Sequence, residues 1–184
     1  MLKYRIISAI KDFRDDTKGV ISIEMVMILP LLLWSFAAVA TFFDAYRTRS
    51  QAEKAAFTIS DMLSRETNAV NAAYITNTRT LFDELASSRD ASSLRVSVIS
   101  WNSQLNAYEV DWSEERGEFF DVLRNNNMTE LAPRLPVLAT SDVLILVETQ
   151  NRYNPLLNVG LGNINIDTFV FTRPRYAPQL VFAS

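Results

Sequence analysis

Residues Val20–Phe43 read VISIEMVMILPLLLWSFAAVATFF, and this apolar stretch, which carries a single charge at Glu24, decides the fold. As a helix it is about 36 Å long, at 1.5 Å per residue. Because the hydrocarbon core of a bilayer is about 30 Å thick, we predict a transmembrane helix over residues 20–43. A carboxylate in apolar surroundings is costly, which makes Glu24 a candidate functional residue. Pro30 lacks the N–H that would bond to the carbonyl of Val26, so a kink is expected there.

The apolar periodicity continues beyond residue 43. No proline or glycine occurs between Leu31 and Glu66, so one helix is predicted from about residue 20 to residue 66. In its second half, small and aliphatic side chains recur at helical spacing: Ala45, Ala52, Ala56, Ile59 and Leu63. We expect this stripe to pack against the chain's own domain. Contact with helices of other subunits is the alternative.

The rest of the chain predicts one more helix and a small antiparallel sheet, an α+β arrangement. The helix is expected near residues 70–87, with Asn68 as its N-cap and an apolar side formed by Tyr74, Leu81, Phe82 and Leu85. The expected strands are residues 94–101, 108–112, 143–147 and 167–173. The unbroken apolar run 143–147 is typical of a strand that is buried on both faces. Short helical turns are expected over residues 119–124 and 128–135.

The first two of these strands read as a hairpin. If Trp101 pairs with Tyr108, strict alternation places Ile99, Val110 and Trp112 on the same face as that pair. The acidic residues that follow or flank the second strand are expected in a solvated loop rather than a calcium site: Asp111, Glu114, Glu115, Glu118 and Asp121.

Charge divides the 184 residues into three parts. Residues 1–19 have a net charge of +2, whereas residues 44–184 hold 13 basic and 17 acidic residues, a net charge of −4. The basic excess before the span places the N-terminus in the cytoplasm and the 44–184 domain outside it. Arg47 and Arg49, directly after the span, act against this orientation. The acidic outer domain argues against nucleic-acid binding.

The chain has no cysteine and no histidine. This excludes thiol catalysis and a Ser-His-Asp triad. Lys54 is the single lysine of the outer domain, which leaves a Ser-Lys pair little support. We therefore expect no enzyme activity, no cofactor and no metal. An enzyme would require a deep polar pocket in the outer domain.

Gly19 immediately precedes the apolar stretch, Glu24 is the fifth residue after it, and Pro30 follows within the span. This segment resembles the N-terminal signal of the type IV pilin superfamily, and more narrowly that of TadE/TadG-like proteins of the tight-adherence (Flp) pilus. Met25 stands where that family usually has an aromatic residue. Two later stretches, Ala56–Arg65 and Thr172–Leu180, are also similar to segments of that family.

The resemblance implies a pilin-like pilus assembly protein of the bacterial inner membrane, either a processed pseudopilin or an uncleaved membrane protein. A prepilin peptidase would cut between Gly19 and Val20. The new ammonium of Val20, or that of an entering neighbour, would then pair with Glu24. The implied partners are other pilus subunits, the inner-membrane assembly platform, the peptidase and the lipid bilayer.

Two other interpretations stay open. Ala38-Val39-Ala40 fits a secretory cleavage site, and a cut there would release a soluble domain. A single-pass binding or sensor module unrelated to pili has the same membrane helix and outer domain.

Overall fold

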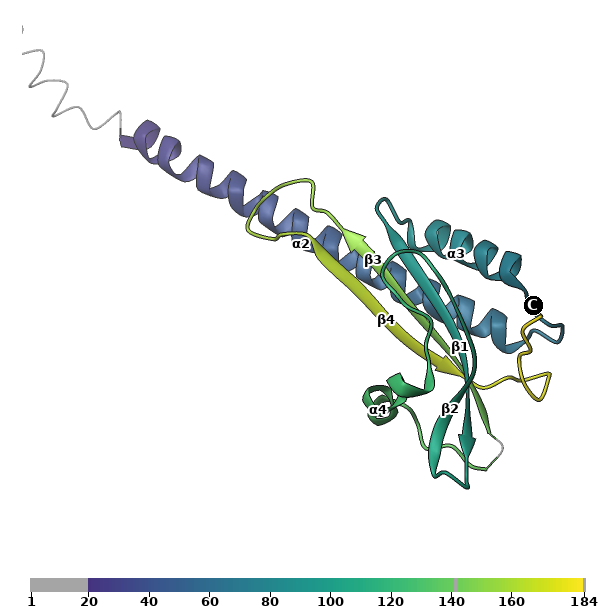
Figure 1. Ribbon diagram of the computed structural model, residues 1–184. Coiled ribbons are helices and arrows are strands. Elements are labelled where there is room, and N and C mark those ends of the chain that lie inside the picture. Colours follow the sequence, from purple (N-terminus) through teal and green to yellow (C-terminus); the bar gives the residue numbers. More distant parts are fainter. Residues whose placement is uncertain (1–19, 141, 184) are drawn as a thin grey trace, which may run out of the picture.

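The computed structural model describes residues 20–140 and 142–183 (Figure 1). Its helices are α2 (Val20–Ser64), α3 (Ala72–Ala86) and α4 (Met128–Leu131), with short 3-10 helices at Asn125–Asn127 and Ala132–Arg134. Its strands are β1 (Ser92–Asn102), β2 (Ala107–Arg116), β3 (Val143–Tyr153) and β4 (Ile164–Thr172). The α+β prediction, with one long helix, a second helix and a four-stranded antiparallel sheet, is confirmed. The predicted leader, residues 1–19, lies outside the described residues.

The sheet holds its strands in the order β2-β1-β3-β4, and every neighbouring pair is antiparallel. Helices α2 and α3 lie on one face of the sheet, with α2 beside β3 and β4 and α3 beside β1 and β2. The main core fills this interface. A smaller core on the opposite face is closed by the segment around α4, through Leu123, Met128, Leu135 and Leu138.

Strand β3 belongs to both cores. Ile145 and Val147 contribute to the core under the helices, and Leu144 and Leu146 contribute to the smaller one. The prediction of a strand buried on both faces is therefore confirmed, because apolar residues at odd and even positions each find a covered side.

Helix α2 confirms the prediction of one long helix, and it ends at Ser64 rather than Glu66. Its predicted stripe is buried at Ala45, Ala52, Ala56, Ile59 and Leu63. Figure 1 shows the C-terminal half of α2 lying along the sheet while the N-terminal half extends away from the domain. The stripe thus packs against the chain's own domain, as expected.

The hairpin of β1 and β2 confirms the pairing of Trp101 with Tyr108, whose rings meet edge to face at 4.9 Å. The predicted face of Trp112 is wrong. Val98 pairs with Trp112 while Ile99 pairs with Val110, so Asp111 is an extra residue in β2 and forms a β-bulge. The bulge turns Trp112 to the helix-covered face, where its Nε1 donates to the Leu180 carbonyl at 2.7 Å.

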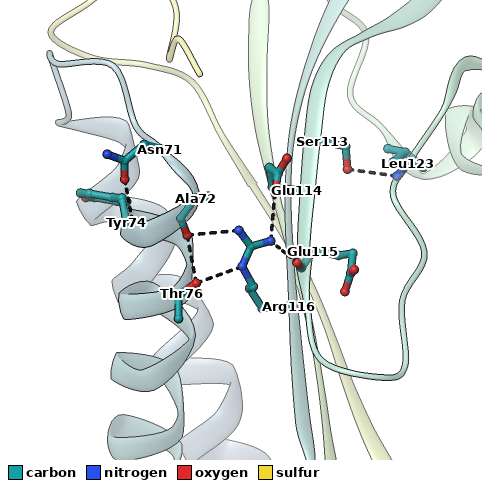
Figure 2. Close-up of polar contacts among 9 residues, drawn as sticks. All are labelled: Asn71, Ala72, Tyr74, Thr76, Ser113, Glu114, Glu115, Arg116 and Leu123. Atoms are coloured by element: carbon teal, nitrogen blue, oxygen red, sulfur yellow. Dashed lines mark hydrogen bonds and ion pairs between the residues drawn. The ribbon is translucent and has the colours of Figure 1, made fainter. Parts of the chain in front are cut away.

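Helix α3 begins at Ala72, and its N-cap is Asn71 rather than the predicted Asn68. The Asn71 Oδ1 accepts the backbone N–H of Tyr74 at 2.9 Å, which satisfies one of the free donors of the first turn (Figure 2). The predicted apolar side is also wrong at Leu81 and Leu85, which are exposed. The buried side consists of Ile75, Thr78, Phe82 and Ala86.

Arg116 fastens the start of α3 to edge strand β2. Its guanidinium donates to Thr76 Oγ1 at 3.0 Å and to the Ala72 carbonyl at 3.1 Å, and it pairs with Glu114 at 2.9 Å (Figure 2).

In the first turn of α3, the Tyr74 hydroxyl donates to Glu66 Oε2 at 3.1 Å. Burial, and then this hydrogen bond to a carboxylate, raise the pKa of Tyr74 to about 12.

Two local predictions between β2 and β3 are wrong. Residues 119–124 form no helix, whereas the three asparagines after them form a 3-10 helix. Asp111, Glu114 and Glu115 lie within β2 and not in a loop. The segment takes its hydrogen bonds from the sheet instead of from a helix: Ser113 Oγ accepts the backbone N–H of Leu123 at 3.0 Å (Figure 2).

Candidate functional site

The N-terminal half of α2 carries the largest uncovered apolar surface among the described residues. Its side chains stay exposed because the sheet and α3 reach only the other half of the helix. They include Met25, Val26, Met27, Leu31, Leu32, Leu33, Trp34, Phe36, Val39 and Phe43. Within the described part of the chain, α2 alone is long and apolar enough to serve as a membrane span or a signal sequence.

The predicted site residues lie at the far end of this half. Val20 is the first residue of α2, while Gly19 lies outside the described residues. Glu24 is exposed on the first turns of the helix, surrounded by exposed Ile23 and Met25, and forms no ion pair with another described residue. Pro30 lies inside α2, which continues on both sides of it. The kink at Pro30 stays a prediction.

The domain is tied to α2 at the point where the apolar stretch ends. The buried hydroxyl of Tyr153, at the end of β3, lies 3.0 Å from Asp44 Oδ2 and 3.4 Å from the Thr41 carbonyl. Burial, and then the hydrogen bond to the Asp44 carboxylate, raise the pKa of Tyr153. This contact holds the C-terminal end of β3 against α2, directly beside the half of α2 that extends away from the domain (residues 20–43, the projecting half).

A polar pocket of about 160 Å³ opens next to this contact. Its walls come from α2, from the turn after α3 and from the end of β3. The charged residues that line it are Asp44, Arg47, Arg89, Asp90 and Arg152, although the Arg152 guanidinium itself stacks on the Phe119 ring, 5.2 Å from its centroid. The sequence singles out Arg47 but does not associate it with Arg89, because these residues belong to separate elements that meet only in the fold.

The loop 154–163, between β3 and β4, lies on the same end of the domain. Figure 1 shows it reaching back along α2, beyond the ends of the strands, toward the projecting half. Leu161 of this loop lines an open groove with Phe42 and Tyr46 of α2. The loop also exposes Leu156 and Leu157, at 85% and 50% of their surface.

No family model, curated protein or solved structure matches this chain.

The arrangement is suited to anchoring and contact. Between residues 20 and 183, leaving out 141, no three His, Cys, Asp or Glu side chains are placed to hold a metal ion. Two features stand out. The projecting half of α2 is apolar and carries one carboxylate, and a polar pocket lies beside an apolar loop where this half meets the domain.

Proposed function

We propose that this chain is a TadE/TadG-like pilus assembly protein, a minor pseudopilin of a Flp-type pilus. In this proposal it is anchored in the bacterial inner membrane by residues 20–43, with the leader in the cytoplasm and residues 44–184 in the periplasm. It acts through contacts with other pilus subunits and with the assembly platform, and it catalyses no reaction.

The observation that carries the proposal is the contrast between the two halves of α2. The C-terminal half is buried by its own domain, while the N-terminal half exposes a continuous set of large apolar side chains. Burying one such side chain is worth about 1.5–3 kcal/mol, so leaving the whole set in water would be very unfavourable. Lipid, or the same helix of neighbouring subunits, is the cover that fits a bare helix of this length.

Glu24 supplies the second support. In a helix surrounded by apolar material an isolated carboxylate charge is costly because the dielectric is low, and a cationic partner would offset that cost. If the leader is cut at Gly19, the new ammonium of Val20 lies one helical turn away from Glu24. An entering subunit offers the same group. Pairing between subunits would fix the axial register of the helices.

We expect Glu24→Gln to abolish or strongly reduce pilus assembly while membrane insertion stays normal. Glutamine keeps the size of the side chain and removes the charge that pairs with an ammonium. Piliation counted by electron microscopy and membrane content by immunoblot check the two parts of this expectation. Glu53→Gln, on the domain half of α2, is the matched control and should assemble normally. Normal piliation of Glu24→Gln would contradict the role given to its charge.

We also expect the mature protein from the native host to begin at Val20. The measurement is intact mass with N-terminal sequencing. A full-length chain in the membrane would remove the pseudopilin claim but keep the anchor. A chain that begins at Thr41, recovered in the aqueous fraction, would remove the anchor as well.

A membrane-anchored binding or sensor module is the second candidate, favoured by the polar pocket beside Asp44 and Tyr153. A gene neighbourhood with a prepilin peptidase and a secretion ATPase would support the pilus role. An isolated gene, or one beside a signalling kinase, would support the sensor.

A further inference from the structure

The depth at which the domain meets the bilayer follows from the length of the span. If the span begins at Val20, a 30 Å hydrocarbon core takes about 20 residues and ends near Val39. Thr41, Asp44 and Arg47 then lie at the level of the lipid headgroups. Because Tyr153 holds the domain to α2 at Thr41 and Asp44, the same depth applies to the end of β3.

Loop 154–163 carries leucines that suit a position at the level of the lipid headgroups. Leu156 is almost uncovered by the domain and Leu157 is half-covered, and Leu161 lines the groove beside Phe42. The loop reaches along α2 toward the span (Figure 1). At this position its leucines are placed to enter the outer edge of the acyl region, which would give them the apolar contact that the domain does not provide.

The polar pocket begins where this loop begins, since Asn154 is part of its lining. Arg47 and Arg89 line it and form no ion pair with any residue in the described ranges. Arg152 also lines it, but its guanidinium stacks on the Phe119 ring, 5.2 Å from the ring centroid. Two guanidinium groups without an ion pair at one pocket are suited to a phosphate, which they bind through paired N–H donors. The pocket volume of about 160 Å³ equals that of several waters, at about 30 Å³ each, and so has room for a phosphate group.

The same pocket also provides acceptors. Asp44 and Asp90 line it, and so does Asn151, which is 1% exposed and whose Oδ1 has no hydrogen-bond partner. A buried acceptor without a donor is unfavourable, and an N–H donor entering the pocket would satisfy it. A ligand that carries only negative charge leaves these acceptors unused and meets two carboxylates.

From this combination of two cations, two carboxylates and a free acceptor beside an apolar loop, we infer that the pocket binds the zwitterionic headgroup of a phospholipid with a primary ammonium. Arg47 and Arg89 hold its phosphate, the acceptors hold its ammonium, and Leu156 and Leu157 contact its acyl chains. This inference rests on the proposed membrane anchor. It assigns the anchor a second contact with the bilayer, which sets the tilt of the domain.

The first test measures lipid preference. The full-length chain, delipidated in mild detergent, is titrated with phosphatidylethanolamine, phosphatidylcholine or phosphatidylglycerol of identical acyl chains, and bound lipid is resolved by native mass spectrometry. Phosphatidylcholine has the same charges but no N–H donor. We expect phosphatidylethanolamine to bind about tenfold more tightly, the equivalent of one hydrogen bond to a charged group.

Two double variants test whether the pocket causes the preference for phosphatidylethanolamine. The double variant Arg89→Gln with Asp90→Asn keeps the net charge, and it should reduce the tenfold preference to about one. The double variant Glu53→Gln with Lys54→Gln is the matched control, because it also removes one charge of each sign from adjacent residues, outside the pocket. Equal binding of the three lipids, stronger binding of phosphatidylglycerol, or an equal loss in the control would overturn the inference. Displacement by soluble phosphoethanolamine at the same concentration as the lipid would also overturn it, in favour of a soluble ligand.

The second test measures depth, and the absence of native cysteine makes it direct. Leu156→Cys and Val137→Cys each receive a fluorophore in the full chain, reconstituted in phosphatidylethanolamine-containing nanodiscs with a nitroxide quencher at shallow acyl depth. Val137 is the control because it is 91% exposed and lies in the segment before β3. We expect strong quenching at position 156 and little at 137. Equal quenching at the two positions would contradict insertion of the loop.

The two proposals fail in different ways. Release of the chain from native membranes by carbonate would contradict the anchor, and with it the lipid site. A chain that resists carbonate but shows neither lipid preference nor quenching at position 156 would contradict the lipid site alone.

Discussion

At the scale of single residues, the backbone at Gly117 requires glycine. Its φ is +123°, and a Cβ there would lie 2.0 Å from Ser93 Oγ. Ser93 Oγ accepts the backbone N–H groups of Glu118 at 2.9 Å and Phe119 at 3.1 Å. The hydroxyl therefore turns the chain sharply at the end of β2, and the close approach requires glycine.

We expect Gly117→Ala to lower the free energy of unfolding by about 1–3 kcal/mol, because it combines backbone strain with a clash against Ser93. Gly162→Ala is the control. Nothing lies within 4 Å of its added methyl group and its φ is not positive, so its effect should be close to zero. Urea unfolding of the full chain in detergent, followed by tryptophan fluorescence, measures both. Equal stability of the two variants would contradict this account.

At the scale of elements, α2 joins two environments along one helix. Its domain half presents Ala45, Ala52, Ala55 and Ala56 to the sheet, and all four are buried. Such small side chains let the helix lie close to β3 and β4, and the larger Ile59 and Leu63 fill the space further along. The projecting half instead carries large apolar side chains that stay exposed, as expected for a helix that lipid or other subunits would cover.

We expect Ala52→Leu to destabilise the domain by about 1–3 kcal/mol, because the fully buried site has no room for the added carbons. Ala40→Leu makes the same change on the same helix, at an exposed position in the projecting half. It should leave the unfolding midpoint of the domain unchanged. Thermal unfolding in detergent, followed by near-ultraviolet circular dichroism, compares the two. A similar loss in both variants would show that the close packing of α2 is not what the leucine disturbs.

At the scale of the whole molecule, the core depends on the second half of α2, on α3 and on the sheet. The residues of the main core begin at Ala45 and end at Leu180, and the projecting half of α2 contributes none of them. The last residues close this core, since Val70 donates to the Val181 carbonyl at 2.8 Å and accepts from Ala183 at 2.7 Å. The domain thus has a core of its own, to which the projecting half does not contribute.

We expect a fragment of residues 44–184 to fold, to unfold cooperatively and to stay in the aqueous fraction. It keeps Asp44, and with it the 3.0 Å hydrogen bond from Tyr153, and it loses the longer contact of Tyr153 with the Thr41 carbonyl together with the exposed apolar half of α2. Circular dichroism, urea unfolding and sedimentation velocity check these three expectations against the full chain in detergent. A fragment without a cooperative transition would show that the projecting half is needed for the core.

Much of the architecture was determined by the sequence alone. The apolar stretch, the stripe from Ala45 to Leu63, the pairing of Trp101 with Tyr108 and the doubly buried β3 all follow from short-range periodicity. A helix repeats every 3.6 residues and a strand every two, so these patterns are visible in the order of the residues. The pattern around Glu24 belongs with them, and its role in assembly stays a prediction.

Other features were decided only by the tertiary structure. The bulge at Asp111 reverses the face of Trp112, and Asn71 caps α3 in place of Asn68. Leu81 and Leu85 face water because the sheet covers the neighbouring side of α3. The pocket joins Arg47 to Arg152, which lie far apart in the chain. The physical reason is common to all four: each depends on which distant segment packs alongside, and local periodicity carries no information about that partner.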